Sequence, residues 1–67
     1  MPSKSQVFIR SKKTFVRYEL FDLNGRIVLQ NPLNDNSIDI TNLEANIYYL
    51  RLFDDLNNHI VKKIVKN

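Results

Sequence analysis

Apolar residues alternate with polar ones along most of the chain, with the period of two that half-buried β-strands require. The alternation is clearest in residues 14–23, where Val16, Tyr18 and Leu20 fall on one face. No segment keeps a helical period, and the final HIVKKIVK is too short and too β-branched to stand alone as a helix. The pattern predicts five or six short strands, at QVFIRS (6–11), TFVRYELFDL (14–23), residues 26–30, SIDI (37–40), IYYLRLF (47–53) and HIVKKIVK (59–66).

The segment IYYLRLF presents two different faces. Tyr48, Leu50 and Leu52 share one of them, which we assign to the core. On the other face, Tyr49 and Phe53 form either an exposed aromatic strip or the packing surface of a second sheet, and we favour the second sheet. The expected core consists of Tyr18, Leu20, Val28, Ile40, Leu43, Tyr48, Leu50 and Ile64.

Two hairpins and a loop are predicted from the turn residues. Asn24-Gly25 predicts a hairpin with a type I′ turn, because both central residues of that turn need positive φ. DDLNN (54–58) predicts a second hairpin turn. NPLNDN (31–36) reads as a loop, since Pro32 lacks a donor and the Asn/Asp cluster favours turns.

The sharp bend in TNLEAN (41–46) contains no glycine, and Gly25 is the only glycine of the chain. Asparagine tolerates the left-handed region better than other non-glycine residues, so it can serve where glycine otherwise would. We therefore expect Asn46, directly before IYYLRLF, to have a positive φ.

Short strands with turns every 8 to 12 residues are typical of a small β-sandwich or barrel. With 67 residues the chain has room for one small domain, and without cysteine it has no disulfide or thiolate metal site to stabilise it. The expected fold is all-β, a small Ig-like antiparallel β-sandwich.

The net charge of +3 is unevenly distributed. Residues 1–30 carry six basic and two acidic side chains, residues 31–58 one basic and five acidic, and residues 59–67 three basic. A nucleic-acid binder concentrates basic charge on one face, whereas here basic ends flank an acidic middle. We interpret the charges mainly as solvated strand faces.

Candidate catalytic and metal-binding residues are few. His59 is the only histidine, and no serine–carboxylate set or cysteine completes a nucleophilic triad around it. Asp35, Ser37 and Asp39 are spaced faintly like a calcium loop, but Ile40 and Asn46 stand where that loop needs Gly and Glu. We expect no enzyme, no metal and no cofactor.

Three motifs, in order along the chain, carry a resemblance. Taken together they resemble the C-terminal sorting domain of the type IX (Por) secretion system of Bacteroidetes. The first is a D-x-x-G-[RK]-x-V hairpin, the second an I-x-x-L-x-x-G-x-Y turn and strand, and the third a terminal K-I-V-K. The matching positions are Asp22, Gly25, Arg26 and Val28, then Ile40, Leu43 and Tyr48, then Lys63, Ile64, Val65 and Lys66.

The chain departs from the family pattern in two places. Asn46 stands where the family has glycine, which agrees with the left-handed bend expected there. The family's tail opens with a strand that ends in P-N-P, and only Pro2 of that stretch is present. We therefore expect a sandwich that lacks its first strand and leaves a sheet edge exposed.

The resemblance implies a non-enzymatic module at the end of a larger secreted protein. The outer-membrane translocon recognises such a module in the periplasm, and the cleavage machinery removes it as the cargo reaches the cell surface or the medium. It also implies sorting roles for the motif residues and for Asn46. Lys62, Lys63 and Lys66 are expected to contact the translocon, to protect an edge strand, or to do both.

Other functions remain as alternatives. An Ig-like accessory module would pack against a catalytic domain or bind carbohydrate through Tyr49 and Phe53. A small nucleic-acid-binding barrel would stack bases on Phe15 beside Arg10, Lys12 and Arg17, but the acidic middle of the chain opposes it and we expect no nucleic acid as partner. An exposed sheet edge also predicts a homodimer at high concentration.

Overall fold

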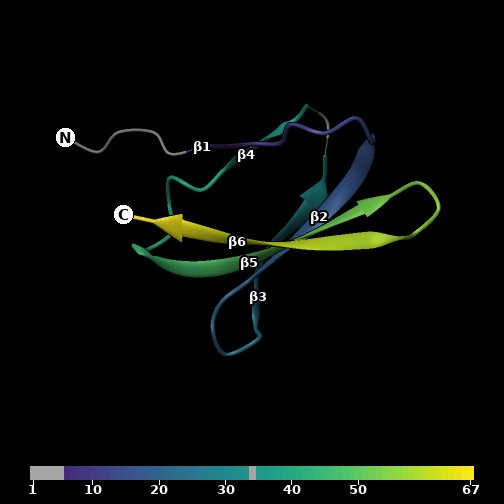
Figure 1. Cartoon of the computed structure of the whole chain (residues 1–67). Coiled ribbons are helices and arrows are strands. Elements are labelled where there is room, and N and C mark those ends of the chain that lie inside the picture. The colour runs from purple at the N-terminus through teal and green to yellow at the C-terminus, as the bar shows by residue number, and fades with distance from the viewer. Residues whose placement is uncertain (1–5, 34) are drawn as a thin grey trace.

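Six strands form two antiparallel sheets in the computed structural model, which describes residues 6–33 and 35–67 (Figure 1). The larger sheet has the order β3-β2-β5-β6, and the smaller sheet pairs β1 with β4. The strands are β1 (Gln6–Phe8), β2 (Phe15–Phe21), β3 (Ile27–Pro32), β4 (Ser37–Asp39), β5 (Asn46–Asp54) and β6 (His59–Lys66). The predicted all-β fold is confirmed, with each strand near its expected place.

The larger sheet consists of two hairpins side by side. β2 pairs with β3 and β5 pairs with β6, and the central β2–β5 pairing joins the hairpins with Leu20 opposite both Leu29 and Leu50. Because β2 and β5 are antiparallel, the two hairpin turns lie at opposite ends of the sheet (Figure 1).

The core lies between the two sheets and confirms the predicted inward face of β5. Tyr48, Leu50 and Leu52 are all buried, and Ile38 and Ile40 from the smaller sheet side pack against them. Of the expected core, Val28, Leu43 and Ile64 are only partly buried at its margin. The fully assembled core consists of Phe15, Tyr18, Leu20, Ile38, Ile40, Tyr48, Leu50 and Leu52.

The assignment of Val16 to the inward face is wrong. Phe15 pairs with Asp54 and Arg17 with Phe53, so the register shifts between them and Val16 becomes an extra residue on β2. A bulge of this kind changes which side chains face the core. As a result Phe15 is 5% exposed and Val16 is 41% exposed.

The expected loop at 31–36 begins later than predicted. β3 continues through Asn31 to Pro32, which lies opposite Arg17. β3 is an edge strand, and proline is tolerated there because one side of the strand needs no donor.

The second sheet does not pack on the face that carries Tyr49 and Phe53, so the interpretation we favoured for them is wrong. Nor do they form an exposed aromatic strip, since Phe53 is 7% exposed while Tyr49 is 40% exposed. The guanidinium carbon of Arg17 lies 3.6 Å from the centroid of the Phe53 ring, and the His59 ring lies 5.6 Å away. Phe53 is thus covered by side chains of its own sheet.

The edges of both sheets are open in the described part of the chain. Within residues 6–33 and 35–67, β1 pairs only with β4, and β3 and β6 each have one partner. Pro2, on which the expectation of a missing first strand was based, lies outside the described residues. The described part of the chain contains no helix long and apolar enough to cross a membrane.

Candidate functional site

The first motif forms the turn between β2 and β3. The Asp22 Oδ1 accepts hydrogen bonds from the backbone N–H groups of Asn24 (2.9 Å) and Arg26 (3.0 Å), and its Oδ2 lies 3.2 Å from Arg26 Nε. The Arg26 N–H in particular stabilises the charged form and lowers the pKa of Asp22. One carboxylate therefore organises the whole turn.

The hairpin was predicted correctly, but the type I′ turn was not. Asp22 N–H donates to the Arg26 carbonyl and Gly25 N–H to the Asp22 carbonyl, which leaves a loop of Leu23, Asn24 and Gly25. Only Gly25 has a positive φ, of 83°. A turn followed by one left-handed residue is the usual three-residue hairpin loop, and it needs glycine at a single position.

The second motif forms the bend between β4 and β5. Leu43 N–H donates to the Ile40 carbonyl (3.1 Å), which closes the turn. The buried Tyr48 returns from β5 and donates its hydroxyl to the Glu44 carbonyl (2.7 Å). The motif tyrosine thus fills the core with its ring and fixes the bend with its hydroxyl.

The expected positive φ at Asn46 is wrong. Asn46 is the first residue of β5, pairs with Lys66, and has no left-handed backbone. Its Oδ1 accepts a hydrogen bond from Ile47 N–H (2.8 Å). Among the described residues, Asn57 in the turn between β5 and β6 is the non-glycine residue with positive φ, of 65°.

The third motif closes on the second through one ammonium group. Lys66 Nζ donates to the carbonyls of Ile40 (2.8 Å), Thr41 (2.9 Å) and Leu43. We call this contact the Lys66 clasp. It satisfies three backbone acceptors of the bend and attaches the end of β6 to a segment more than 20 residues earlier in the chain. The interpretation of Lys66 as a surface lysine of an edge strand is therefore wrong.

A hollow of about 510 Å³ brings the first two motifs together. Asp22 and Arg26 line it from the β2–β3 turn, and Leu43, Asn46 and Tyr48 line it from the bend. Since Lys66 is bonded to the same bend, elements of all three motifs lie at one end of the sandwich. We call this region the motif end.

The comparison with family models agrees with this arrangement. The model described as secretion system C-terminal sorting domain matches residues 1–67, the whole chain. The chain belongs to this family. The sorting domain directs the secretion of a cargo protein across the outer membrane through the type IX system, and the family is non-catalytic. Comparison with curated proteins and with solved structures gives no match.

Some motif residues of the sorting domain are exposed to solvent. Lys63 and Val65 face outward on β6, opposite Tyr49 and Ile47. Both are exposed, as is Arg26 in the β2–β3 turn. The motif residues therefore divide into a set that builds the fold and a set that faces solvent.

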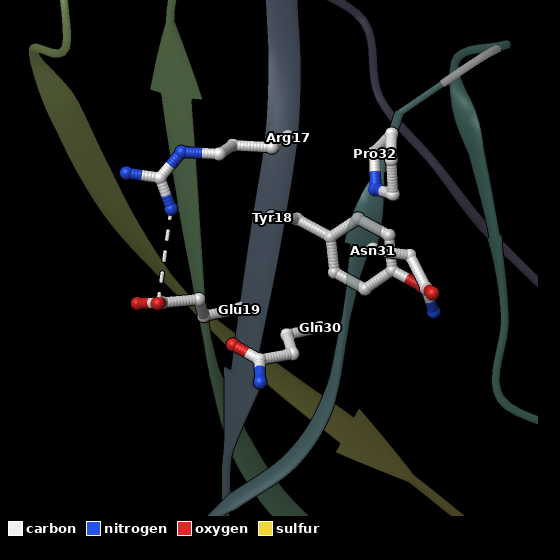
Figure 2. Close-up of a pocket in the computed structure, with 6 residues that line it drawn as sticks. All are labelled: Arg17, Tyr18, Glu19, Gln30, Asn31 and Pro32. Carbon is white, nitrogen blue, oxygen red and sulfur yellow. Dashed lines mark hydrogen bonds and ion pairs between the residues drawn. The ribbon is translucent and has the colours of Figure 1, made fainter.

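The outward face of the larger sheet carries a ladder of charges and rings. Figure 2 shows Arg17 and Glu19 reaching toward each other from β2, with Tyr18 directed to the other side of the strand. Glu19 lies within 3.8 Å of Arg17 NH1 and 3.5 Å of Arg51 NH1. The depression beside them, of about 230 Å³, lies between β2 and β3 and is lined by the six residues that Figure 2 labels.

The residues that the nucleic-acid alternative required do not lie together. Phe15 is buried in the core, where no base can stack on it. Arg17 covers Phe53 on the outward face, where its guanidinium also contacts Glu19. A continuous basic groove with accessible rings is therefore not formed by these side chains.

The sequence gives no signal for the Lys66 clasp. Lys66 is part of the K-I-V-K motif, but its partners are backbone carbonyls, which every residue has, so no residue type marks them as partners. Only the three-dimensional approach of β6 to the bend reveals the contact.

Proposed function

We propose that the type IX translocon recognises the solvent-facing residues at and beside the motif end, and that the remaining motif residues hold them in place. The observation that carries the proposal is the Lys66 clasp, because it fixes the terminal strand to the bend. Under this proposal Arg26, Lys63 and Val65 contact the translocon. The residues with a supporting role are Asp22, Gly25, Val28, Leu43, Asn46, Tyr48, Ile64 and Lys66.

The proposed contact residues are supported by their exposure and their neighbours. Val65 is 58% exposed, and Tyr49, opposite Lys63 on β5, is 40% exposed. Exposed apolar side chains beside cationic ones are typical of a surface that another protein covers.

We further propose that residues 1–67 are the C-terminal sorting module of a larger secreted protein. In that protein an upstream cargo domain precedes the module, and the cleavage machinery separates the two after export. The family assignment supports this arrangement.

The experiment that tests the proposed contact uses two neighbouring lysines on opposite faces of β6. Lys63 faces outward opposite Tyr49, whereas Lys62 lies opposite the core residue Leu50. A periplasmic reporter fused to the sorting domain is expressed in a bacterium with the type IX system, with Lys63→Glu or Lys62→Glu. We expect Lys63→Glu to leave reporter in the periplasm and Lys62→Glu to be exported like the parent.

Both variants must first be shown to fold, by thermal denaturation of the purified domains. Exposed strand substitutions of this kind change stability by no more than about 0.5 kcal/mol. Equal export of folded Lys63→Glu and the parent would contradict the proposed contact. Lys66 is left unchanged, because its loss would disturb the fold itself.

We also propose that two copies associate through β3 at high concentration. β3 is an edge strand, and Ile27–Pro32 contains no charged side chain to repel a second copy. β6 is less suited to self-pairing, because it carries Lys62, Lys63 and Lys66.

Light scattering across a concentration series measures this association. Gln30 is exposed on β3, so Gln30→Lys adds a charge to the edge without disturbing the core. We expect dimers of the parent at millimolar concentration and monomers of the variant. A parent that stays monomeric throughout would exclude the β3 dimer.

A further inference from the structure

An apolar groove opens along the edge of the sandwich, between β1 and β6. Its cavity of about 160 Å³ lies between Val7–Ser11 on one side and Ile60, Lys62, Lys63 and Ile64 on the other. The core residues Phe15, Leu50 and Leu52 form part of its lining. The groove is distinct from the motif end, with which it shares none of these residues.

Both walls of the groove are strand edges. β6 is paired on one side only, with β5, and β1 on one side only, with β4, within the described residues. Such edges have backbone N–H and C=O groups free to pair with an added strand. Main-chain bonds then provide affinity, and alternate side chains of the added strand enter the groove.

Exposed apolar side chains flank this edge. Phe8 on β1 is 66% exposed and Ile60 on β6 is 37% exposed. An added strand with apolar residues at alternate positions would cover both and would reach the groove floor. This favours an extended ligand over a compact one.

The charges around the groove select among possible strands. Arg10, Lys62 and Lys63 line it, and none of the described residues that line it is acidic. Lys62 lies opposite the buried Leu50, at an inward position of β6, yet it is exposed. Neither Arg10 nor Lys62 forms an ion pair with any residue that the structure describes.

We propose that this groove binds an extended peptide segment that adds as a strand to the free edge of β6 and carries both acidic and apolar side chains at the alternate positions that face the groove. Its acidic side chains pair with Arg10 and Lys62, and its apolar side chains cover Phe8 and Ile60. Charge complementarity also disfavours the β6 strand of a second copy as the occupant, because that strand brings three more lysines. Lys63 lines this groove and is also a proposed translocon contact, so the peptide binding is tested on the purified domain, without the translocon.

The test is a titration of the isotope-labelled 67-residue domain, followed by amide NMR shifts and hydrogen exchange. The probe is a short capped peptide that carries glutamate and valine in turn at every second position, with serine between them, so that both kinds of side chain face the groove. One control peptide replaces glutamate by lysine, and a second replaces alternate residues by proline, which removes backbone donors. We expect the amide signals of Gln6–Ser11 and His59–Lys66 to shift, and the amides on the unpaired edge of β6 to exchange more slowly. Only the glutamate peptide should cause these changes.

Lys62→Glu and Lys12→Glu form the matched pair of variants, since they change the net charge equally. Lys62 lines the groove and Lys12 does not. We expect Lys62→Glu to weaken peptide binding roughly three- to tenfold, and Lys12→Glu to change it less than twofold. The amide spectrum of each free variant shows whether it has kept the fold.

Four outcomes would overturn the proposal. The first is equal binding of the glutamate and lysine peptides, and the second is a shift map on the outward face around Tyr49 instead of β1 and β6. The third is the same β6 shifts on concentrating the domain without peptide, which would identify a second copy as the occupant. Absence of any shift at millimolar peptide would also reject it.

Discussion

The two hairpins of the larger sheet have the same turn built from different residues. Asp22 N–H donates to the Arg26 carbonyl at 2.9 Å, and Asp54 N–H donates to the Asn58 carbonyl at 2.9 Å. In each turn the aspartate Oδ1 accepts two further backbone N–H groups, two and four residues later. In each, the fourth residue is left-handed.

The difference lies in that left-handed residue and in the depth of the aspartate. Gly25 occupies the position in the first turn with φ 83°, and Asn57 in the second with φ 65°. The side chain of Asp22 is 18% exposed and that of Asp54 is 9% exposed. Asn57 also accepts a hydrogen bond from Arg17 NH2 (3.1 Å), a contact that glycine cannot make.

The two turns share a requirement for one left-handed residue and an aspartate, and either glycine or asparagine can supply the left-handed residue. The idea that asparagine replaces glycine in this chain was correct, but it was assigned to Asn46 instead of Asn57. The hairpins differ as well at their open ends, where only β6 is held by a clasp.

The largest expected effect concerns that open end. Lys66→Met removes the ammonium that three carbonyls accept, and hydrogen bonds to charged groups contribute about 1.5–3 kcal/mol. We expect a loss of unfolding free energy in that range, measured by denaturant titration. Lys63→Met is the matched control, because Lys63 is exposed and outside the clasp; equal losses in both would show that the clasp does not stabilise the fold.

The next effect breaks the turns at their left-handed residue. Gly25→Val and Asn57→Val each place a β-branched side chain at positive φ, which costs about 1–2 kcal/mol. A Cβ on Gly25 would meet no atom within 4 Å, so the cost there is backbone strain alone. Melting temperatures unchanged in both variants would contradict the shared turn geometry.

A smaller effect separates Asn57 from Asn46. Asn57→Gly relieves the left-handed residue but loses the exposed bond to Arg17, so we expect stability within about 1 kcal/mol of the parent. Asn46→Gly gains no such relief and should destabilise by about 0.5–1 kcal/mol, as glycine does in a strand. Thermal denaturation distinguishes them, and a clear stabilisation by Asn46→Gly would restore the earlier assignment.

The smallest expected effect is a dependence of the free energy of unfolding on pH. It is small because protonation removes the charge of Asp22 and Asp54 but leaves both side chains in the turns. The pKa of Asp22 is lowered, and the hydrogen bond from the Arg26 backbone N–H is the largest cause. Burial raises the pKa of Asp54, but hydrogen bonds from Asn58 and Leu56 outweigh it and the net pKa is lowered. A lowered pKa in the folded state means that the unfolded chain binds protons first, so this stability is present above the ordinary value of 3.8 and is lost as pH falls below it.

Denaturant titrations between about pH 7 and pH 3 measure this dependence. We expect Asp22→Asn and Asp54→Asn each to flatten the profile, since each removes one titrating group. A profile of unchanged slope in both variants would show that neither carboxylate contributes.

Sequence reasoning recovered what depends on neighbours along the chain. The alternation in IYYLRLF placed Tyr48, Leu50 and Leu52 in the core, and Asn24-Gly25 located a hairpin. Sequence reasoning failed where one extra residue in a strand changes which side chains face the core. The extra residue Val16 shifts the register of β2, and nothing in a strongly β-forming segment marks the bulge beforehand.

The site was predicted less completely than the fold. The three motifs indicated which residues matter, but not which of them support the fold and which face solvent. Lys63 and Lys66 look alike in K-I-V-K, yet one is exposed and the other is bonded to the bend. That distinction depends on an approach between segments 23 to 26 residues apart, which periodicity cannot encode.

The Lys66 clasp also imposes an order in time. A ribosome releases the bend at residues 40–43 well before Lys66, so the bend's carbonyls wait for a partner that is synthesised later. A chain that stops before Lys66 lacks the ammonium group, and the three carbonyls of the bend lose their side-chain partner. The clasp can therefore form only after β6 has been synthesised.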